Sequence, residues 1–296
     1  MNPGKKFRES VAQNELLKCL GATTAYHALL AEKSGAKALY ISGGGVAAGS
    51  LGVPDLGIST LNDVAIDVER ICARTSLPVL VDIDTGWGGA FNIARAINTL
   101  EKAGAGAIHI EDQVQQKRCG HRPNKALVSK AEMKDRIKSA ADARISDDFV
   151  IMARTDSLAQ YGLEAAIDIM GECIDAGADM VFPEAVSELA IYKKITESIT
   201  VPVLANITEF GLTPLFTTDE LIGAGVKIAL YPLSAFRAAN QAALNVYQQI
   251  IATGSQQGVL ETMQTREELY QYLGYHRYEQ QLDQLFNKGQ NDVNSI

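Results

Sequence analysis

Eight short apolar runs recur along the chain, and most are followed by a stretch with helical spacing of its apolar residues. The runs cover residues 17–21, 38–42, 78–82, 107–111, 149–154, 180–183, 202–206 and 227–231. They are almost continuously apolar, as strands buried on both faces of a parallel sheet are. Amphipathic stretches at 61–75, 91–103, 130–144, 163–176 and 186–198 predict helices between them.

This alternation predicts an α/β protein, a (β/α)₈ TIM-type barrel over residues 1–254. Eight strand–helix units in roughly 250 residues are typical of that fold. Gly104 and Gly177 follow two of the predicted helices, where glycine commonly ends a helix. A doubly wound open sheet is the alternative. Its G-x-G-x-x-G fingerprint is missing, because the glycine-rich segment 43–49 has another spacing and follows the second strand.

Residues 255–296 have a different character and predict a helical C-terminal tail. The segment 265–268, Thr-Arg-Glu-Glu, reads as a capping box that opens a helix. Aromatic residues are dense after it: Tyr270, Tyr272, Tyr275, Tyr278 and Phe286. Two interpretations stay open, packing against the chain's own barrel and a subunit interface, where aromatic residues are enriched.

Composition narrows the class of protein. The chain has 296 residues, of which 47% are hydrophobic and 21% charged, as in an ordinary globular protein with a large core. No apolar run approaches the roughly 20 residues of a membrane span, and no secretory signal is visible. Four scattered cysteines indicate neither a zinc site nor a disulfide framework, so we expect a cytoplasmic protein. The net charge of −8 argues against nucleic acid as a partner.

Polar and charged residues stand where the predicted strands end. In a (β/α)₈ barrel the carboxyl ends of the strands carry the chemistry. Here those positions hold Ser42, Asp82, Asp84, Glu111, Arg154, Asp156, Glu184, Asn206 and Arg237. A purely structural barrel has no need of charges at that end, so the pattern favours an enzyme.

Asp82 and Asp84 predict a metal site. Alternate residues of a strand point the same way, so both carboxylates can face one site. They repel each other unless a cation lies between them, and hard oxygen ligands suit Mg²⁺, with Mn²⁺ as the alternative. Pairing with a lysine or arginine is the competing interpretation.

The segment 117–125, Lys-Arg-Cys-Gly-His-Arg-Pro-Asn-Lys, is the candidate catalytic loop. It places Cys119 and His121 among four permanent cations. Nearby positive charge favours the thiolate form of a cysteine and attracts a polyanionic substrate. The alternative is a solvated basic turn.

Together these groups predict a reaction on a small polycarboxylate. Arg154, Arg237 and Arg266 are candidate carboxylate binders. No lysine at a strand end suggests a Schiff base. With a Schiff base disfavoured, the remaining mechanism is a metal that stabilises an enolate. It favours aldol-type carbon–carbon cleavage or another enolate reaction.

The same residues resemble the isocitrate lyase/phosphoenolpyruvate mutase superfamily over almost the whole chain. The matching stretches are residues 42–46, 54–57, 82–86, 117–121, 153–156, 182–184, 206–211, 231–232, Arg237 and 263–266. The Asp-x-Asp-Thr-Gly stretch at 82–86 is common to the superfamily, whereas the cysteine loop separates its lyases from its phosphonate mutases. Lys-Arg-Cys in that loop is most similar to the members that cleave methyl-branched isocitrate.

The resemblance implies a role for each matching residue. Asp82 and Asp84 would serve the Mg²⁺ site, and Cys119 would be the catalytic thiol. The substrate-binding residues would be Ser42, Gly43, Gly44, Asp55, Gly120, Arg154, Glu184, Asn206, Ile207, Thr208, Arg237 and Arg266. It also implies a barrel whose eighth helix is swapped to a neighbouring subunit, usually in a homotetramer.

The implied activity is Mg²⁺-dependent retro-aldol cleavage of a small tricarboxylate, 2-methylisocitrate, to pyruvate and succinate in the methylcitrate cycle of propionate catabolism. Cys119 would protonate the succinate carbanion, which requires a thiol although the surrounding cations favour thiolate. Tyr40 is a candidate base, with a structural tyrosine as the alternative. Isocitrate cleavage, oxaloacetate decarboxylation and dimethylmalate cleavage are the rival reactions. The alternative from a different functional class is a metal-bound binding protein without catalytic activity.

Overall fold

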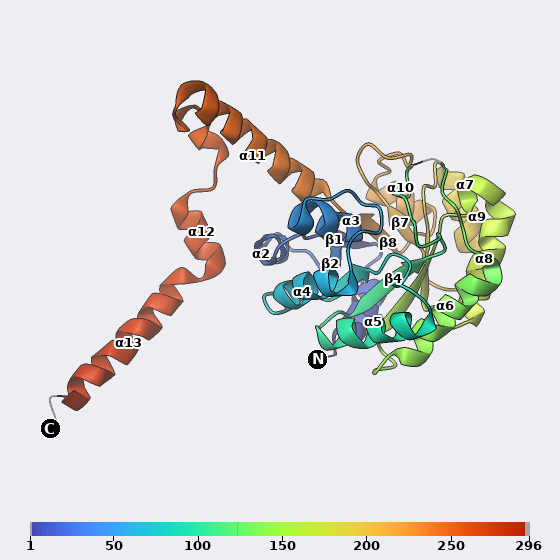
Figure 1. The fold of residues 1–296 in the computed structure, drawn as a ribbon, viewed down its shortest axis with the longest axis horizontal. Coiled ribbons are helices and arrows are strands. Elements are labelled where there is room, and N and C mark those ends of the chain that lie inside the picture. Colours follow the sequence, from blue (N-terminus) through green and yellow to red (C-terminus); the bar gives the residue numbers. More distant parts are fainter. Residues whose placement is uncertain (1, 123, 294–296) are drawn as a thin grey trace. The chain divides into compact units, whose positions relative to one another are not determined.

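The strands form a barrel of eight parallel strands in the computed structural model, which describes residues 2–122 and 124–293 (Figure 1). They are β1 Leu17–Gly21, β2 Ala38–Ile41, β3 Val79–Asp82, β4 Ala107–Glu111, β5 Val150–Thr155, β6 Met180–Pro183, β7 Leu204–Asn206 and β8 Ile228–Tyr231. Neighbours in the chain are neighbours in the sheet, and β1 also pairs with β8. A single parallel bridge between Val181 and Val203 joins β6 to β7. The predicted barrel is therefore confirmed.

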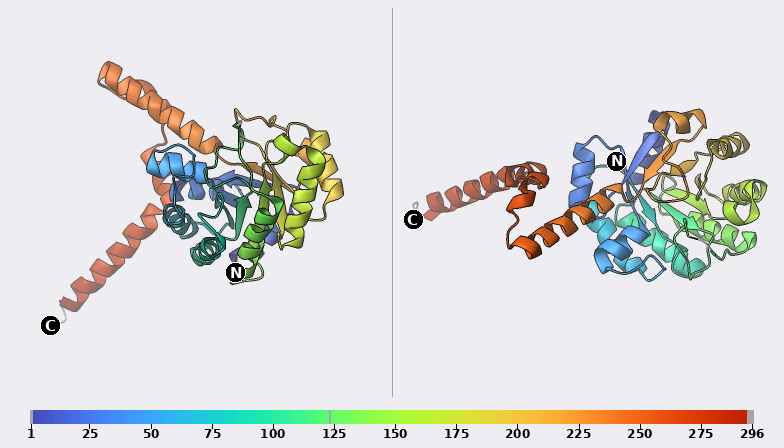
Figure 2. Two further views of the ribbon diagram at one scale, coloured as in Figure 1. Left: turned by 45° about the vertical axis from the view of Figure 1, so that its right-hand side comes forward. Right: turned by 90° about the horizontal axis from the view of Figure 1, so that it is seen from above.

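Helices surround this barrel (Figure 2). The barrel unit contains α1 Pro3–Gln13, α2 Ala25–Lys33, α3 Gly43–Val46, η1 Ala47–Leu51, α4 Leu61–Cys72, α5 Ala90–Lys102, α6 Lys130–Ala143, α7 Leu158–Tyr161, α8 Leu163–Asp175, α9 Leu189–Ser198 and α10 Thr218–Gly223. The five helices predicted from amphipathic spacing are α4, α5, α6, α8 and α9. Gly104 and Gly177 have φ of 103° and 113°, so both adopt the backbone that favours glycine after a helix.

Apolar side chains fill the barrel from inside and join it to its helices from outside. The interior cluster contains Leu80, Met152 and Phe182, and the first helix closes it with Phe7, which is fully buried. Two outer clusters pack the strands against α4–α6 and against α8–α10. The strands other than β1, in which Lys18 is exposed, thus bury both faces almost throughout, which explains their continuous apolar runs.

The chain divides into two compact units, Met1–Arg237 and Ala238–Ile296. The second contains most of α11 Ser234–Thr253, the short helix η2 Gln257–Thr262, α12 Arg266–Leu273 and α13 Tyr275–Val293. Thr265 and Glu268 form the predicted capping box of α12. The domain boundary that we place at residue 254 stays a prediction. Across the described residues, no helix combines the length and apolarity needed to span a bilayer.

Candidate active site

A cavity of about 400 Å³ opens at the carboxyl ends of the strands. Eleven of the residues predicted for the site line it: Ser42, Gly44, Asp55, Asp82, Cys119, Gly120, Arg154, Glu184, Asn206, Thr208 and Arg237. They come from segments that lie far apart in the sequence. The barrel brings them together because parallel strands end at one rim.

The other four predicted residues do not line this cavity. Gly43 and Asp84 lie beside it, next to Asp82. Ile207 turns its side chain into an outer apolar cluster and donates its backbone N–H to Leu230 O at 2.8 Å. Arg266 begins α12 in the second unit, so its role in binding substrate stays a prediction.

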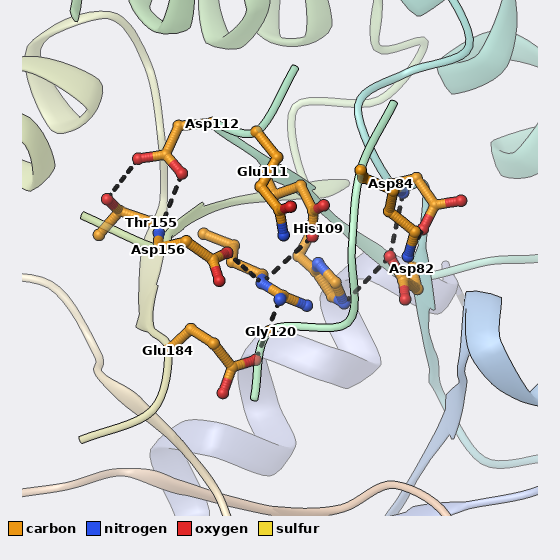
Figure 3. A network of polar contacts seen from close by, with 12 residues as sticks. Asp82, Asp84, His109, Glu111, Asp112, Gly120, Thr155, Asp156 and Glu184 are labelled. Carbon is orange, nitrogen blue, oxygen red and sulfur yellow. Dashed lines mark hydrogen bonds and ion pairs between the residues drawn. The ribbon is translucent and has the colours of Figure 1, made fainter. Parts of the chain in front are cut away.

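Asp82 and Asp84 are buried side by side at the end of β3 (Figure 3). The backbone N–H of Asp84 donates to Asp82 Oδ1 at 3.0 Å, and that of Gly43 donates to Asp82 Oδ2 at 3.0 Å. Asp84 has a φ of 49°, which turns the chain sharply behind the strand. Lys117 reaches this pair from the cysteine loop, with Nζ 2.5 Å from Asp84 Oδ1 and 2.7 Å from Asp55 Oδ1.

The two aspartates differ in acidity. Burial works to raise the pKa of Asp82, but the charges of His109, Lys117 and Arg154 outweigh it, so the pKa falls below its ordinary value. Burial raises the pKa of Asp84 to about 6, against the opposing attraction of Lys117. A second cation beside Asp84 would favour its charged form.

The residues present fit a hard divalent cation. Carboxylate oxygens from Asp82 and Asp84 are the ligands that Mg²⁺ prefers. Asp84 Oδ1 has no aligned hydrogen-bond donor although Lys117 Nζ lies close to it, and both oxygens of the buried Glu111 also lack one. A Cβ on Gly43 would come within 2.9 Å of Asp84 Oδ1 and 3.1 Å of Asp82 Oδ2, so the glycine keeps space open beside both carboxylates. No cluster of three or more His, Cys, Asp or Glu arranged as metal ligands occurs within the described residues.

Arg154 is a buried cation of the site and is paired with three carboxylates. Its Nε lies 3.1 Å from Asp156 Oδ2 and 3.3 Å from Glu111 Oε2, and its Nη2 lies 3.1 Å from Glu184 Oε2. Burial would lower the pKa of the guanidinium, but these carboxylates raise it well above its ordinary value. Burial also raises the pKa of Glu111, and Arg154 does not compensate fully.

Residues of the cysteine loop line the same cavity. Cys119 is exposed and lines both this cavity and a neighbouring one of about 960 Å³, which lies between residues 54–57 and 115–119 and also contacts Arg122 and Asn124. On one side of the thiol, the buried Gln113 exchanges two hydrogen bonds of 2.9 Å with the backbone of Arg118. On the other side, His121 Nε2 lies 3.3 Å from Glu184 Oε1.

Sequence reasoning missed His109. This residue is fully buried, and its Nε2 lies 2.9 Å from the hydroxyl of Tyr40 and 3.6 Å from Asp82 Oδ1. Burial lowers the pKa of His109 to about 4 and raises that of Tyr40 well above its ordinary value, so the phenol keeps its proton. The available signal was alternation, because His109 and Glu111 are two residues apart on one strand and therefore face the same interior.

Comparisons with known proteins agree with this arrangement. A barrel with paired carboxylates, a buried guanidinium and a thiol at its catalytic end defines an enzyme for small anionic substrates. The family model described as phosphoenolpyruvate phosphomutase matches residues 7–251, and the chain belongs to this family.

Its relatives narrow the class further. The chain is 58% identical to "2-methylisocitrate lyase" of Escherichia coli (strain K12), over 98% of both chains. A crystal structure of 2,3-dimethylmalate lyase has a TM-score of 0.89 and is 32% identical, with 96% of both chains covered. A phosphonopyruvate hydrolase complex with oxalate and Mg²⁺ has a TM-score of 0.83 and is 27% identical, covering 94% of this chain and 97% of that one. The protein is thus an enzyme of the carbon–carbon lyase class.

Proposed function

We propose that the protein cleaves 2-methylisocitrate to pyruvate and succinate with the help of Mg²⁺. The observation that carries the proposal is the cavity in which Asp82, Arg154 and Cys119 meet. The 58% identity to a 2-methylisocitrate lyase over nearly the whole chain supports this substrate above other members of the family.

The cavity suits a small tricarboxylate. Its volume of about 400 Å³ is within the range of small-molecule sites. Arg122, Arg154 and Arg237 line it and offer positive charge to carboxylates. Asn206 adds an amide near Glu184, with Nδ2 3.3 Å from Glu184 Oε1.

Asp82 and Asp84 would hold the metal, consistent with the Mg²⁺ named in the phosphonopyruvate hydrolase complex. A bound Mg²⁺ supplies positive charge where negative charge develops on the oxygens of the substrate. Gly43 and Asp82 fix each other through a hydrogen bond, so the carboxylate keeps its orientation before substrate arrives.

The protons balance within one turnover. A base takes the tertiary hydroxyl proton, and rupture of the C2–C3 bond leaves pyruvate and a succinate carbanion. The thiol of Cys119 then donates its proton to that carbon, and the proton taken from the hydroxyl returns to the thiolate through solvent before the next turnover. Arg154 would hold a substrate carboxylate, which keeps the reacting carbon within reach of the thiol.

Steady-state kinetics tests the substrate and the metal together. With Mg²⁺ present, we expect kcat/KM for 2-methylisocitrate to exceed that for isocitrate by about 10- to 200-fold, because one methyl group contributes about 1–3 kcal/mol. Pyruvate and glyoxylate report the two reactions, and EDTA should stop both until Mg²⁺ is restored. A preference for isocitrate or 2,3-dimethylmalate would overturn the substrate, and turnover that resists EDTA would overturn the metal.

We also propose that the protein is a homotetramer in which the C-terminal helices pack on neighbouring subunits, with the eighth helix swapped. Apolar side chains form an exposed stripe on α11, at Leu244, Tyr247 and Ile251. A second exposed stripe runs along α13, at Tyr275, Tyr278, Leu282, Leu285 and Phe286. Two such exposed apolar stripes in the C-terminal unit are typical of surfaces covered by another chain.

Sedimentation equilibrium should therefore give the mass of four chains. Ile251→Asp places a charge in the α11 stripe, so we expect it to dissociate the assembly, whereas Ile145→Asp, at an exposed position of the barrel unit, should leave it intact. A monomeric wild-type protein would contradict the proposal. We further propose a cytoplasmic location and a role in propionate catabolism. The four free cysteines suit a reducing compartment.

A further inference from the structure

A buried lysine fastens the catalytic loop to the barrel. The ammonium of Lys125 donates to Gly120 O at 2.5 Å and to Asp156 Oδ1 at 2.5 Å, and its side chain is 5% exposed. In the sequence, Gly120 directly follows Cys119, the residue that carries the thiol. The hydrogen bond therefore fixes the carbonyl group of the residue that follows Cys119.

The same lysine connects the loop with Arg154. Asp156 accepts Lys125 on Oδ1 and Arg154 Nε on Oδ2, the latter at 3.1 Å, and its own N–H donates to Asp112 Oδ1 at 2.9 Å. Burial would raise the pKa of Asp156, but Arg154 and Lys125 lower it below its ordinary value, so the carboxylate is charged. One fixed carboxylate thus holds both the loop and the guanidinium.

The fit between these two elements is close. A Cβ on Gly120 would lie 2.4 Å from Arg154 Nη2 and 2.6 Å from Glu184 Cγ, so the loop backbone lies directly against the groups proposed to bind substrate. Gln113 holds Arg118 on the other side of the thiol. Cys119 therefore lies between two anchored neighbours, and its own carbonyl accepts the N–H of Arg122 at 2.8 Å.

We propose that Lys125 is the positioning residue of the reaction, which sets the distance between the Cys119 thiol and the substrate carboxylate held by Arg154. The inference rests on the proposed role of Cys119 as proton donor. Without the ammonium, the carbonyl of Gly120 would lose its donor and the loop could move as a unit. A displacement of about 1 Å in such a geometry can cost about 100-fold in rate.

Two variants of the full-length enzyme, Lys125→Ala and Lys125→Arg, test this role. For Lys125→Ala we expect kcat, measured well below the melting temperature, to fall about 100-fold, with KM for 2-methylisocitrate almost unchanged. The melting temperature should fall as well, because the buried Asp156 loses one of its two cations. Added propylammonium, which can occupy the vacated space, should restore part of kcat, while tetramethylammonium, which has no N–H, should not. Lys125→Arg keeps a donor and should retain more activity than Lys125→Ala. The matched control is Lys130→Ala, because Lys130 is an exposed lysine paired with Asp168 outside the site.

Limited trypsinolysis supplies a measurement that does not depend on turnover. Cleavage between Arg118 and Cys119, identified by mass, should become about tenfold faster in Lys125→Ala than in wild type or Lys130→Ala, because the loop opens more often. Faster cleavage with unchanged kcat would overturn the positioning role, as would a loss of kcat with neither faster cleavage nor amine rescue. If wild-type enzyme fails to cleave 2-methylisocitrate, the proposed function fails, and the proteolysis still decides whether Lys125 anchors the loop.

Discussion

Cys119→Ala is expected to reduce kcat for 2-methylisocitrate by about 1,000-fold, within the range that a positioned acid contributes. The thiol lines the cavity and is the group proposed to protonate the succinate carbanion. Alanine cannot donate a proton, so the carbanion would recombine with pyruvate or wait for water. Calorimetric titration should give a substrate Kd within about threefold of wild type, because the cations proposed to bind the substrate carboxylates are untouched.

The control for this variant removes a thiol elsewhere. Cys72→Ala deletes a half-buried sulfur near Gly104, on the outside of the barrel, and should leave kcat unchanged. Because Cys119 is exposed, its loss should also leave the melting temperature unchanged. Residual turnover above about a tenth of wild type in Cys119→Ala would remove the thiol from the mechanism.

Most strands of the barrel could be predicted because they bury both faces. A strand buried in this way has apolar residues at successive positions, so it is visible in the sequence as a continuous apolar run. That Asp82, Arg154 and Glu184 lie together could be predicted for a related reason. Each is a charge at or directly after such a run, and the barrel rule places all strand ends at one rim.

Other features depend on contacts that no local pattern records. The helix α1 was not predicted, although its Phe7 closes the barrel interior, because one short amphipathic segment does not reveal where it docks. The sequence around Lys125 predicts only another charged residue of a basic loop. The burial of Lys125 depends on Asp156, which lies 31 residues away in the chain. His109 read as part of a strand, and only the folded barrel places it beside Tyr40 and Asp82.

Arg154→Gln should cause the largest loss of stability, about 3–5 kcal/mol of unfolding free energy, because it leaves buried carboxylates without their cation. Glu111, Asp156 and Glu184 all lie within 3.3 Å of its guanidinium nitrogens. Urea unfolding with Mg²⁺ absent measures the loss. The matched control, Lys138→Gln, breaks an exposed pair with Asp142 and should cost less than about 1 kcal/mol.

The direction in which the stability loss changes with pH distinguishes uncompensated buried charge from a simple packing defect. Arg154 lowers the folded-state pKa of Asp156 and opposes the rise that burial causes in the pKa of Glu111, so its loss would raise the pKa of both carboxyls and penalise the variant most where these groups are charged. Its stability deficit relative to wild type should therefore shrink as the pH falls from 8 towards 5. Adding Glu184→Gln to Arg154→Gln removes one of the uncompensated charges and should recover part of the loss. A deficit that is independent of pH and unaffected by the second substitution would show that Arg154 stabilises the barrel by packing on Phe182, whose ring centre lies 5.2 Å from the guanidinium carbon.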